Sequence, residues 1–179
     1  MKRVVVTGMG MVSPLGCGVD VTWKRLINGE SGIRTISSFD TSDIPAKIAG
    51  MVPREEGEEG CFNPDDWMPS KEARRVDTFI LYGISAAQQA VEDSGWLPES
   101  DEDRCRTGIM VGSGIGGLPC IADGSVLVDS GKVRRLSPFF IPASLINLIS
   151  GHVSIKYGIK GPNMAPEIGR ASCRERVYC

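Results

Sequence analysis

The sequence predicts an α/β fold, because strand-like and helix-like segments alternate along the chain. Two short runs, 4–7 and 107–112, are rich in β-branched residues and lead into glycine-rich loops, which is typical of buried strands. Two longer segments, 76–94 and 142–157, carry apolar residues at spacings of three and four, which indicates amphipathic helices. With 179 residues, the chain is long enough for one domain with its own hydrophobic core.

The composition is that of an ordinary globular protein, with 41% hydrophobic and 23% charged residues. A net charge of −2 argues against a nucleic-acid-binding protein whose whole surface is basic. No apolar run is long enough to cross a membrane and no signal-peptide pattern is present, so we expect a cytoplasmic protein with no membrane partner. The six cysteines form no Cys-x-x-Cys pair and only one histidine accompanies them, so we expect reduced thiols and neither a metal nor another cofactor.

The two glycine-rich loops, 8–16 and 113–118, resemble phosphate-binding loops only in composition. In the first, Ser13 and Pro14 stand where a dinucleotide-binding motif has its third glycine and the start of its helix. In the second, no lysine follows in the phosphate-binding position. A nucleotide-binding oxidoreductase is therefore a weak alternative, which cofactor binding to the purified chain would test.

A first helix is expected at about 20–28, with Asp20 as its N-cap and Gly29 closing it. The apolar face of this helix would consist of Trp23, Leu26 and Ile27. The acidic, glycine-containing segment 53–60 is expected to be an exposed loop without a metal site.

The helix expected at 76–94 has small residues at positions 83, 86, 87 and 90, which predict close packing against another backbone. A basic cluster precedes it, and a second basic pair precedes the turn at 137–141. On the residues alone, such clusters are more commonly a solvated face than a binding site. A partner rich in Asp and Glu would nevertheless be attracted to them.

The segment 136–163 carries the most distinctive pattern of the chain. A Ser-Pro-Phe-Phe-Ile turn, which we expect to be buried, leads into the helix expected at 142–157. Pro142 lies near the first position of that helix, where a missing N–H costs no hydrogen bond. Gly158 is expected to end this helix in the left-handed conformation, before a tight Gly-Pro-Asn turn. His152 lies within the helix, and we expect it to be a packed residue rather than a general base.

Together, the opening segment 7–16, the loop 112–117 and the segment 136–163 closely resemble the condensing-enzyme family, and within it the β-ketoacyl-(acyl carrier protein) synthases of the type II elongation class. The resemblance covers residues 1–165 and implies the thiolase-like layered α/β fold, here its N-terminal half only. It implies decarboxylative Claisen condensation in fatty acid biosynthesis. The implied partners are the acyl- or malonyl-loaded acyl carrier protein and, in the intact protein, a second copy of the chain.

The resemblance also implies roles for particular residues. Ile115 would line the acyl pocket, and Phe140 and Ile141 would reach across the dimer interface into the pocket of the other subunit. The basic residues before the helix and before the turn would bind the acidic carrier protein, namely Lys71, Arg74, Arg75, Arg134 and Arg135.

No catalytic residue is expected in this chain. The family reaction uses a cysteine in a Thr-Ala-Cys motif, two histidines and a supporting lysine, whereas this sequence has one histidine and no such motif. Cys173 lies near the expected position of the nucleophile, but its charged neighbours would leave it exposed. We therefore expect an inactive, truncated synthase. The alternative is a non-catalytic chain-length factor or polyketide-synthase homologue that acts as a binding or dimerisation module.

The texture of the sequence changes after Ala165. Residues 167–177 contain three arginines and two glutamates without strand-like alternation, and they resemble a translated sequencing adapter. Residues 166–179 are therefore expected to be a non-native tail, so that no strand follows the 161–163 turn. We also expect the chain to aggregate, because the apolar faces of the helices at 76–94 and 142–157 would be bare.

Overall fold

The computed structural model describes residues 3–54 and 57–167, which divide into two compact units. One unit combines the chain up to residue 64 with residues 85–95, and the other combines 65–84 with the chain from residue 96 onward. Helix α3 (Thr78–Ser94) contributes its first turns to the second unit and its remaining turns to the first.

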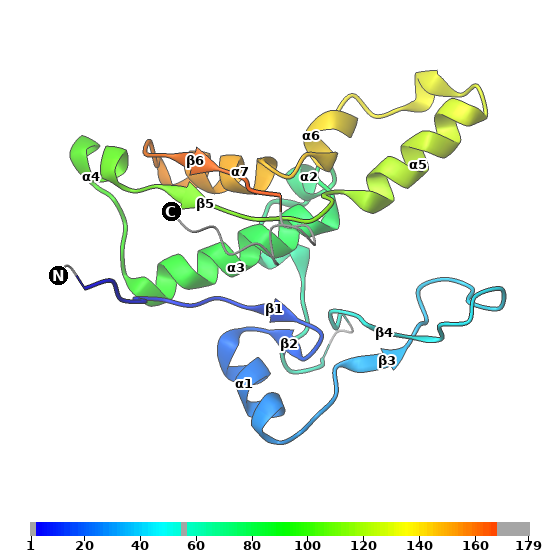
Figure 1. The fold of residues 1–179 in the computed structure, drawn as a ribbon, viewed down its shortest axis with the longest axis horizontal. Coiled ribbons are helices and arrows are strands. Elements are labelled where there is room, and N and C mark those ends of the chain that lie inside the picture. Colours follow the sequence, from blue (N-terminus) through cyan, green and yellow to red (C-terminus); the bar gives the residue numbers. More distant parts are fainter. Residues whose placement is uncertain (1–2, 55–56, 168–179) are drawn as a thin grey trace, which may run out of the picture. The chain divides into compact units, whose positions relative to one another are not determined.

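Helices make up most of the regular structure, and the strands are short and paired two by two (Figure 1). Besides α3, the helices are α1 (Val19–Ile27), α2 (Ser70–Ala73), α4 (Asp101–Arg106), α5 (Leu118–Asp129), α6 (Phe140–Ser144) and α7 (Leu148–Tyr157), with 3-10 turns at Pro64–Asp66 and Val133–Arg135. The strand pairs are β1 (Val12–Ser13) antiparallel to β2 (Gly16–Cys17), β3 (Ile33–Thr35) antiparallel to β4 (Ile48–Gly50), and β5 (Ile109–Met110) parallel to β6 (Asn163–Met164).

In the first unit, the N-terminal segment 3–11 runs extended along the second half of α3 (Figure 1). Two glycines allow the backbones to approach. A Cβ added at Gly8 would lie 2.3 Å from the carbonyl oxygen of Ala90, and one at Gly10 would lie 1.9 Å from that of Ala86. The predicted packing of small residues of this helix against another backbone is confirmed.

The prediction of a buried strand at 4–7 is wrong in this structure. Among the described residues no strand pairs with this segment, and Val4, Val5 and Val6 are 97%, 72% and 81% exposed. A β-branched run favours the extended conformation, but a buried strand also needs neighbours that cover its edges and faces. The described part of the chain does not supply them.

Helix α1 forms close to where it is expected, but its apolar side faces solvent. The helix follows Gly18, which takes the N-cap position in place of Asp20. The expected apolar face is exposed to 61% at Trp23, 54% at Leu26 and 65% at Ile27. The 3.6-residue period therefore locates the helix correctly without showing what covers it.

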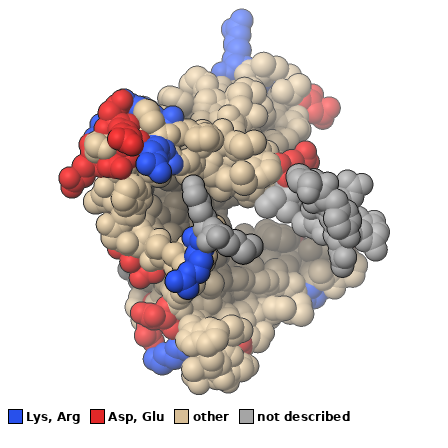
Figure 2. Space-filling view, turned by 60° about the vertical axis from the view of Figure 1, so that its left-hand side comes forward, with Lys and Arg blue, Asp and Glu red and all other residues tan. Residues whose placement is uncertain are grey.

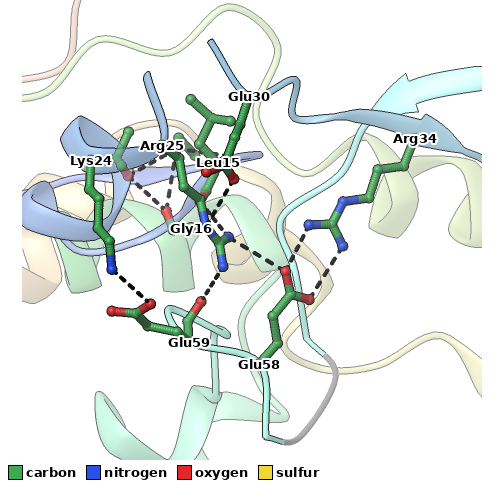
Figure 3. Close-up of polar contacts among 10 residues, drawn as sticks. Leu15, Gly16, Lys24, Arg25, Glu30, Arg34, Glu58 and Glu59 are labelled. Carbon is green, nitrogen blue, oxygen red and sulfur yellow. Dashed lines mark hydrogen bonds and ion pairs between the residues drawn. The ribbon is translucent and has the colours of Figure 1, made fainter. Parts of the chain in front are cut away.

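The acidic loop, expected to lie free in solvent, is anchored to α1 and β3 (Figure 3). Arg25, whose side chain is 15% exposed, donates to the carbonyl oxygens of Leu15 at 2.7 Å and Glu59 at 2.8 Å. The carboxylate of Glu58 accepts both terminal nitrogens of Arg34, at 3.3 and 2.7 Å. The hydrogen bonds from Arg34 hold the pKa of Glu58 below its ordinary value. The loop thus contributes to the scaffold of the first unit.

In the second unit, α7 packs closely on the first turns of α3. Ile80 and Ile84 are buried on α3, and Ile149 and Val153 are buried on α7. Gly83 allows this contact, because an added Cβ would lie 2.7 Å from Cγ2 of Ile149. The expectation that the apolar faces of these two helices are bare is therefore wrong.

The single helix expected at 142–157 is in fact two helices. Leu145 is extended between α6 and α7, with a ψ of 134°. Hydrogen bonds of Ser144 account for the break: its carbonyl oxygen accepts the N–H of Gly117 at 3.1 Å, and its hydroxyl donates to the carbonyl oxygen of Phe140 at 2.9 Å. Both compete with a continuous helical ladder.

The chain after α7 contains a strand that the sequence did not lead us to expect. The helix ends at Gly158 with a φ of 64°, as predicted, and β6 then pairs with β5. The parallel ladder continues to a bridge between Ser113 and Glu167. The expectation that no strand follows the turn is therefore wrong as far as Glu167, because backbone pairing does not require side-chain alternation. Residues 168–179, including Cys173, lie outside the described residues.

Charged residues gather in small groups on the face drawn in Figure 2, where uncharged residues cover most of the surface. Within the described ranges, no helix is both long enough and apolar enough to span a membrane.

Candidate functional site

A surface cavity of about 330 Å³ lies where the segment 74–78, the start of α5 and the segment 137–143 meet. Arg74 and Arg75, which directly follow the C-terminal end of α2, line the basic side of the cavity. Asp77 and Phe140 line it as well. Figure 1 shows α2, α6 and the first turns of α5 adjoining one another. The cavity thus combines two cations, the carboxylates of Asp77 and Asp123, and aromatic rings at the surface of the second unit.

Arg75 contacts an aromatic ring. The carbon of its guanidinium group lies 4.6 Å from the centroid of the Phe139 ring, which is 37% exposed. At this distance the positive charge is attracted to the negative face of the ring. Arg75 therefore connects the end of α2 with the turn that leads into α6.

Asp77 links the basic segment to α5. One of its carboxylate oxygens, Oδ2, accepts the backbone N–H of Cys120 at 3.0 Å. Cys120 is the third residue of α5, whose N-cap position is occupied by Gly117 and therefore has no side chain to accept this N–H. Asp77 supplies the missing acceptor from outside the helix, and its negative charge is favourable at the helix N-terminus.

The thiol of Cys120 lines the same cavity, and its pKa is raised above the ordinary value. Burial is the main cause that raises its pKa, and the carboxylates of Asp77 and Asp123 raise it further. The sulfur lies 3.8 Å from the carbonyl oxygen of Phe140, to which it donates. A thiol with a raised pKa is a poor nucleophile, so this cysteine has a packing role.

The predicted basic residues make no ion pair with a described carboxylate, which is also true of Lys132 and Lys156. Among the described residues, Arg25, Arg34 and Lys160 each contact a carboxylate. No described carboxylate pairs with any of the residues predicted to bind a carrier protein, all of which are exposed, namely Lys71, Arg74, Arg75, Arg134 and Arg135. These side chains are therefore free to meet an acidic partner.

The structure brings only part of this basic set together. Arg74 and Arg75 line the cavity at the N-terminal end of α5, and Lys71 lies just before them on α2. Arg134 and Arg135 lie in the 3-10 turn that follows the C-terminal end of α5, and they do not line the cavity. The two basic groups are thus associated with opposite ends of one helix.

Ile115 lies in an exposed loop whose backbone is held by α6. Gly117 donates to the carbonyl oxygen of Ser144, and a Cβ at Gly116 would lie 2.4 Å from that same oxygen. Gly116 has a φ of +91°, which favours glycine. The side chain of Ile115 is 66% exposed, so in this structure it lines neither of the two cavities described around Phe140.

Phe140 packs directly on α5. A Cβ at Gly124 would lie 2.5 Å from Cε2 of the Phe140 ring, so the absence of a side chain at Gly124 allows this contact. Phe140 lines the cavity described above and a second one of about 320 Å³, whose other walls include Val128 and Leu136. Ile141, the next residue, is 57% exposed. The expectation that the turn 137–141 is buried is wrong, because only Phe140 packs into the fold there. The roles expected for Ile115, Phe140 and Ile141 stay predictions.

His152 is half-buried in α7 and lines neither cavity. Burial lowers its pKa below the ordinary value of 6.5, and the carboxylate of Glu72 opposes this shift. Within the described part of the chain, no three His, Cys, Asp or Glu side chains are grouped so that they could hold a metal ion.

Sequence reasoning missed Asp77, Phe139 and Gly124. Asp77 directly precedes α3, so the sequence suggests that its side chain caps that helix. In the structure its carboxylate accepts a hydrogen bond from the first turn of α5. Nothing in the spacing of Phe139 or Gly124 indicates their partners. The basic cluster was recognisable because its residues adjoin one another in the sequence, although its role stays a prediction. Packing between distant segments leaves no such signal in the sequence.

Comparison with known proteins defines the class. The profile of the family described as "Beta-ketoacyl synthase, N-terminal domain" matches residues 1–173, so the chain belongs to this family, as the sequence predicted.

Two curated relatives within this family are similar to the chain over most of its length. The chain is 56% identical over 164 residues to 3-oxoacyl-(acyl-carrier-protein) synthase 2 of Rhizobium meliloti (strain 1021), which covers 91% of the chain and 39% of the relative. It is 45% identical to the mitochondrial 3-oxoacyl-(acyl-carrier-protein) synthase of Arabidopsis thaliana, covering 92% of the chain and 38% of the relative. The chain thus spans about two fifths of the length of these relatives.

Solved structures support the predicted fold class. A ketosynthase/chain length factor of ishigamide superposes with a TM-score of 0.74 at 24% identity, over 91% of the chain and 39% of that protein. A type II polyketide ketosynthase in complex with its acyl-carrier protein superposes with a TM-score of 0.62 at 25% identity, over 89% of the chain and 40% of that protein. The described chain therefore has the fold of the N-terminal part of a thiolase-like ketosynthase.

Proposed function

We propose that this chain is the N-terminal part of a 3-oxoacyl-(acyl carrier protein) synthase II, which elongates acyl chains in fatty acid biosynthesis. The observation that carries the proposal is the 56% identity to the Rhizobium meliloti synthase over 91% of the chain. In the proposed reaction, malonyl-carrier protein loses CO₂. Its α-carbon then forms a bond to the carbonyl carbon of an enzyme-bound acyl thioester, and the enzyme thiolate leaves.

The 179-residue chain itself is proposed to be inactive. The mechanism needs a cysteine nucleophile and two histidines, and this sequence contains one histidine, which is half-buried with a lowered pKa. We propose that the catalytic groups belong to a part of the protein that this chain does not contain. Residues 166–179 are proposed to be a non-native tail, which sequencing of the source DNA across codon 165 would test. We further propose a homodimer and a cytoplasmic location for the intact protein.

Acyl carrier protein is the proposed partner, and it would dock on the exposed cations at Lys71, Arg74 and Arg75, with Arg134 and Arg135 as a second contact. The exposure of these side chains, and the absence of carboxylate partners for them among the described residues, are compatible with this assignment. Ile115, Phe140 and Ile141 are the proposed acyl-pocket residues. The apolar, partly exposed state of Phe140 and Ile141 is compatible with burial against an acyl chain or a second subunit.

Charge reversal tests the docking proposal. Arg74→Glu should weaken binding of acyl carrier protein by about tenfold or more at low salt, because a like charge then faces the acidic partner. Arg106→Glu makes the same change of charge at an exposed residue at the end of α4 and should leave the affinity unchanged. Titration calorimetry with the protein from the complete reading frame would measure both. Equal affinities for the two variants would refute docking at this site.

A non-catalytic binding module is a second candidate, because a ketosynthase/chain length factor has the same fold with a TM-score of 0.74. This candidate predicts carrier binding and dimerisation without condensation. The residue at the end of the nucleophile strand in the complete gene would distinguish the two: a cysteine supports the synthase, and any other residue supports the binding module.

A further inference from the structure

Two contacts made by the short segment 75–77 connect the basic surface with the elements around the cavity. Arg75 lies against the ring of Phe139 at 4.6 Å, and Asp77 accepts the N–H of Cys120 at 3.0 Å. The first contact reaches the turn that carries Phe140 and Ile141. The second reaches the first turn of α5. The segment 75–77, which itself lines the cavity, therefore contacts the two other elements that line it, the turn 137–141 and the start of α5.

The two contacts differ in strength and in exposure. The bond from Asp77 is a charge-assisted hydrogen bond to a helix N-terminus that has no other side-chain cap, so it holds α5 in place. The contact of Arg75 is a cation–π interaction between an exposed arginine and a partly exposed ring, and such contacts are individually weak. If the segment 75–77 is disturbed, the contact with Phe139 is therefore the one that gives way.

Arg75 can form a stronger contact than the one it has. No described carboxylate pairs with it, and its guanidinium would bind a carboxylate or phosphate with two parallel hydrogen bonds. An acidic partner would therefore compete with the Phe139 ring for the same guanidinium group.

We infer that Arg75 is a positioning residue that exchanges the Phe139 ring for an acidic group of the carrier protein when the carrier docks, so that docking releases the turn 137–141 next to the cavity. The inference rests on the proposed function, which places the carrier at Lys71, Arg74 and Arg75. Because coupling between two contacts is reciprocal, the Phe139 ring must lower the affinity for the carrier by as much as carrier binding weakens the ring contact.

A double-mutant cycle with acyl carrier protein as the titrant tests this linkage, using the protein from the complete reading frame. Phe139→Leu frees Arg75 and should tighten carrier binding about two- to fivefold, which corresponds to the strength of an exposed cation–π contact. The same substitution in an Arg75→Ala background should change nothing, because no guanidinium is left to free. In an Arg74→Ala background, the matched control, Phe139→Leu should again tighten binding.

Phe139→Tyr keeps a ring at this position and should bind the carrier with the affinity of the unmodified protein. It thus separates loss of the ring from general disturbance of the turn, and thermal unfolding of each variant checks that the fold is intact. An unchanged affinity for Phe139→Leu, or the same change with and without Arg75, would overturn the inference while leaving carrier docking in place. If the unmodified protein does not bind the carrier at all, the docking proposal fails together with this inference.

Discussion

At Gly124, a hydrogen in place of a methyl group allows the ring of Phe140 to lie directly on α5. Gly124→Ala should lower the free energy of unfolding by about 1–3 kcal/mol, because the added Cβ would lie 2.5 Å from the ring and must displace it. Gly151→Ala is the matched control: it lies in α7 with open space around an added Cβ, and it should raise stability by about 0.5–1 kcal/mol. Urea denaturation measures both. Similar effects of the two substitutions would contradict the seat of Phe140 on Gly124.

His152 should make the stability depend on pH. Burial lowers its pKa in the folded protein, so the unfolded chain binds the proton more readily. The stabilising contribution of His152 to the free energy of unfolding is therefore fully present above its ordinary pKa of 6.5. It is lost as the pH falls below that value.

Urea denaturation at about pH 7.5 and about pH 5.5 tests this, since the two values lie on either side of the ordinary histidine pKa. The unmodified protein should lose more stability between them than the variant His152→Gln, which has no titrating group at this position. Equal losses would show that the folded protein does not disfavour the protonated histidine.

A residue whose role depends on its sequence neighbours was predictable from the sequence, as the helix-ending Gly158 shows. The carrier-binding role of the adjacent arginines at 74 and 75 stays a prediction. The role of Asp77 was not predictable, because its partner Cys120 is 43 residues away and the bond depends on how two helices meet. Phe139 and Gly124 were missed for the same reason.

At the scale of elements, α5 depends on a cap that another segment provides. Asp77→Ala should lower the free energy of unfolding by about 1 kcal/mol, because the N–H of Cys120 loses its acceptor. Asp77→Asn retains an acceptor oxygen and should cost less. Hydrogen exchange of the amides in the first turn of α5 would locate the effect. Unchanged exchange there in Asp77→Ala would show that the cap does not hold the helix.

The periodicity of apolar residues predicted where the helices lie. It was less reliable for helix breaks and for which residues are buried. The helices expected at 20–28 and 76–94 form as α1 and α3 within two residues at each end. The helix expected at 142–157 is broken at Leu145, because the hydrogen bond that Ser144 donates to Phe140 and the one that it accepts from Gly117 compete with the helical ladder. The run 4–7 is extended but exposed, since burial of a strand depends on neighbours that its own sequence does not specify.

At the scale of the whole molecule, the family and the fold class were predictable because several spaced motifs agree along the chain. Which apolar surfaces are buried was not predictable from the sequence. Ile80 and Ile84 of α3 and Ile149 of α7 are buried, whereas the segment 4–6 and one side of α1 are exposed. The expected aggregation of the chain stays a prediction, and these two surfaces are where we expect it to originate.

A condensation assay tests whether this chain is an inactive part of a 3-oxoacyl-(acyl carrier protein) synthase. The protein from the complete reading frame and the 179-residue chain would each be mixed with an acyl-carrier thioester and malonyl-carrier protein, and the release of CO₂ and the 3-oxoacyl product would be followed. We predict both products, in equal amounts, from the complete protein and neither from the 179-residue chain. Condensation by the 179-residue chain, or no condensation by the complete protein, would contradict the proposed function.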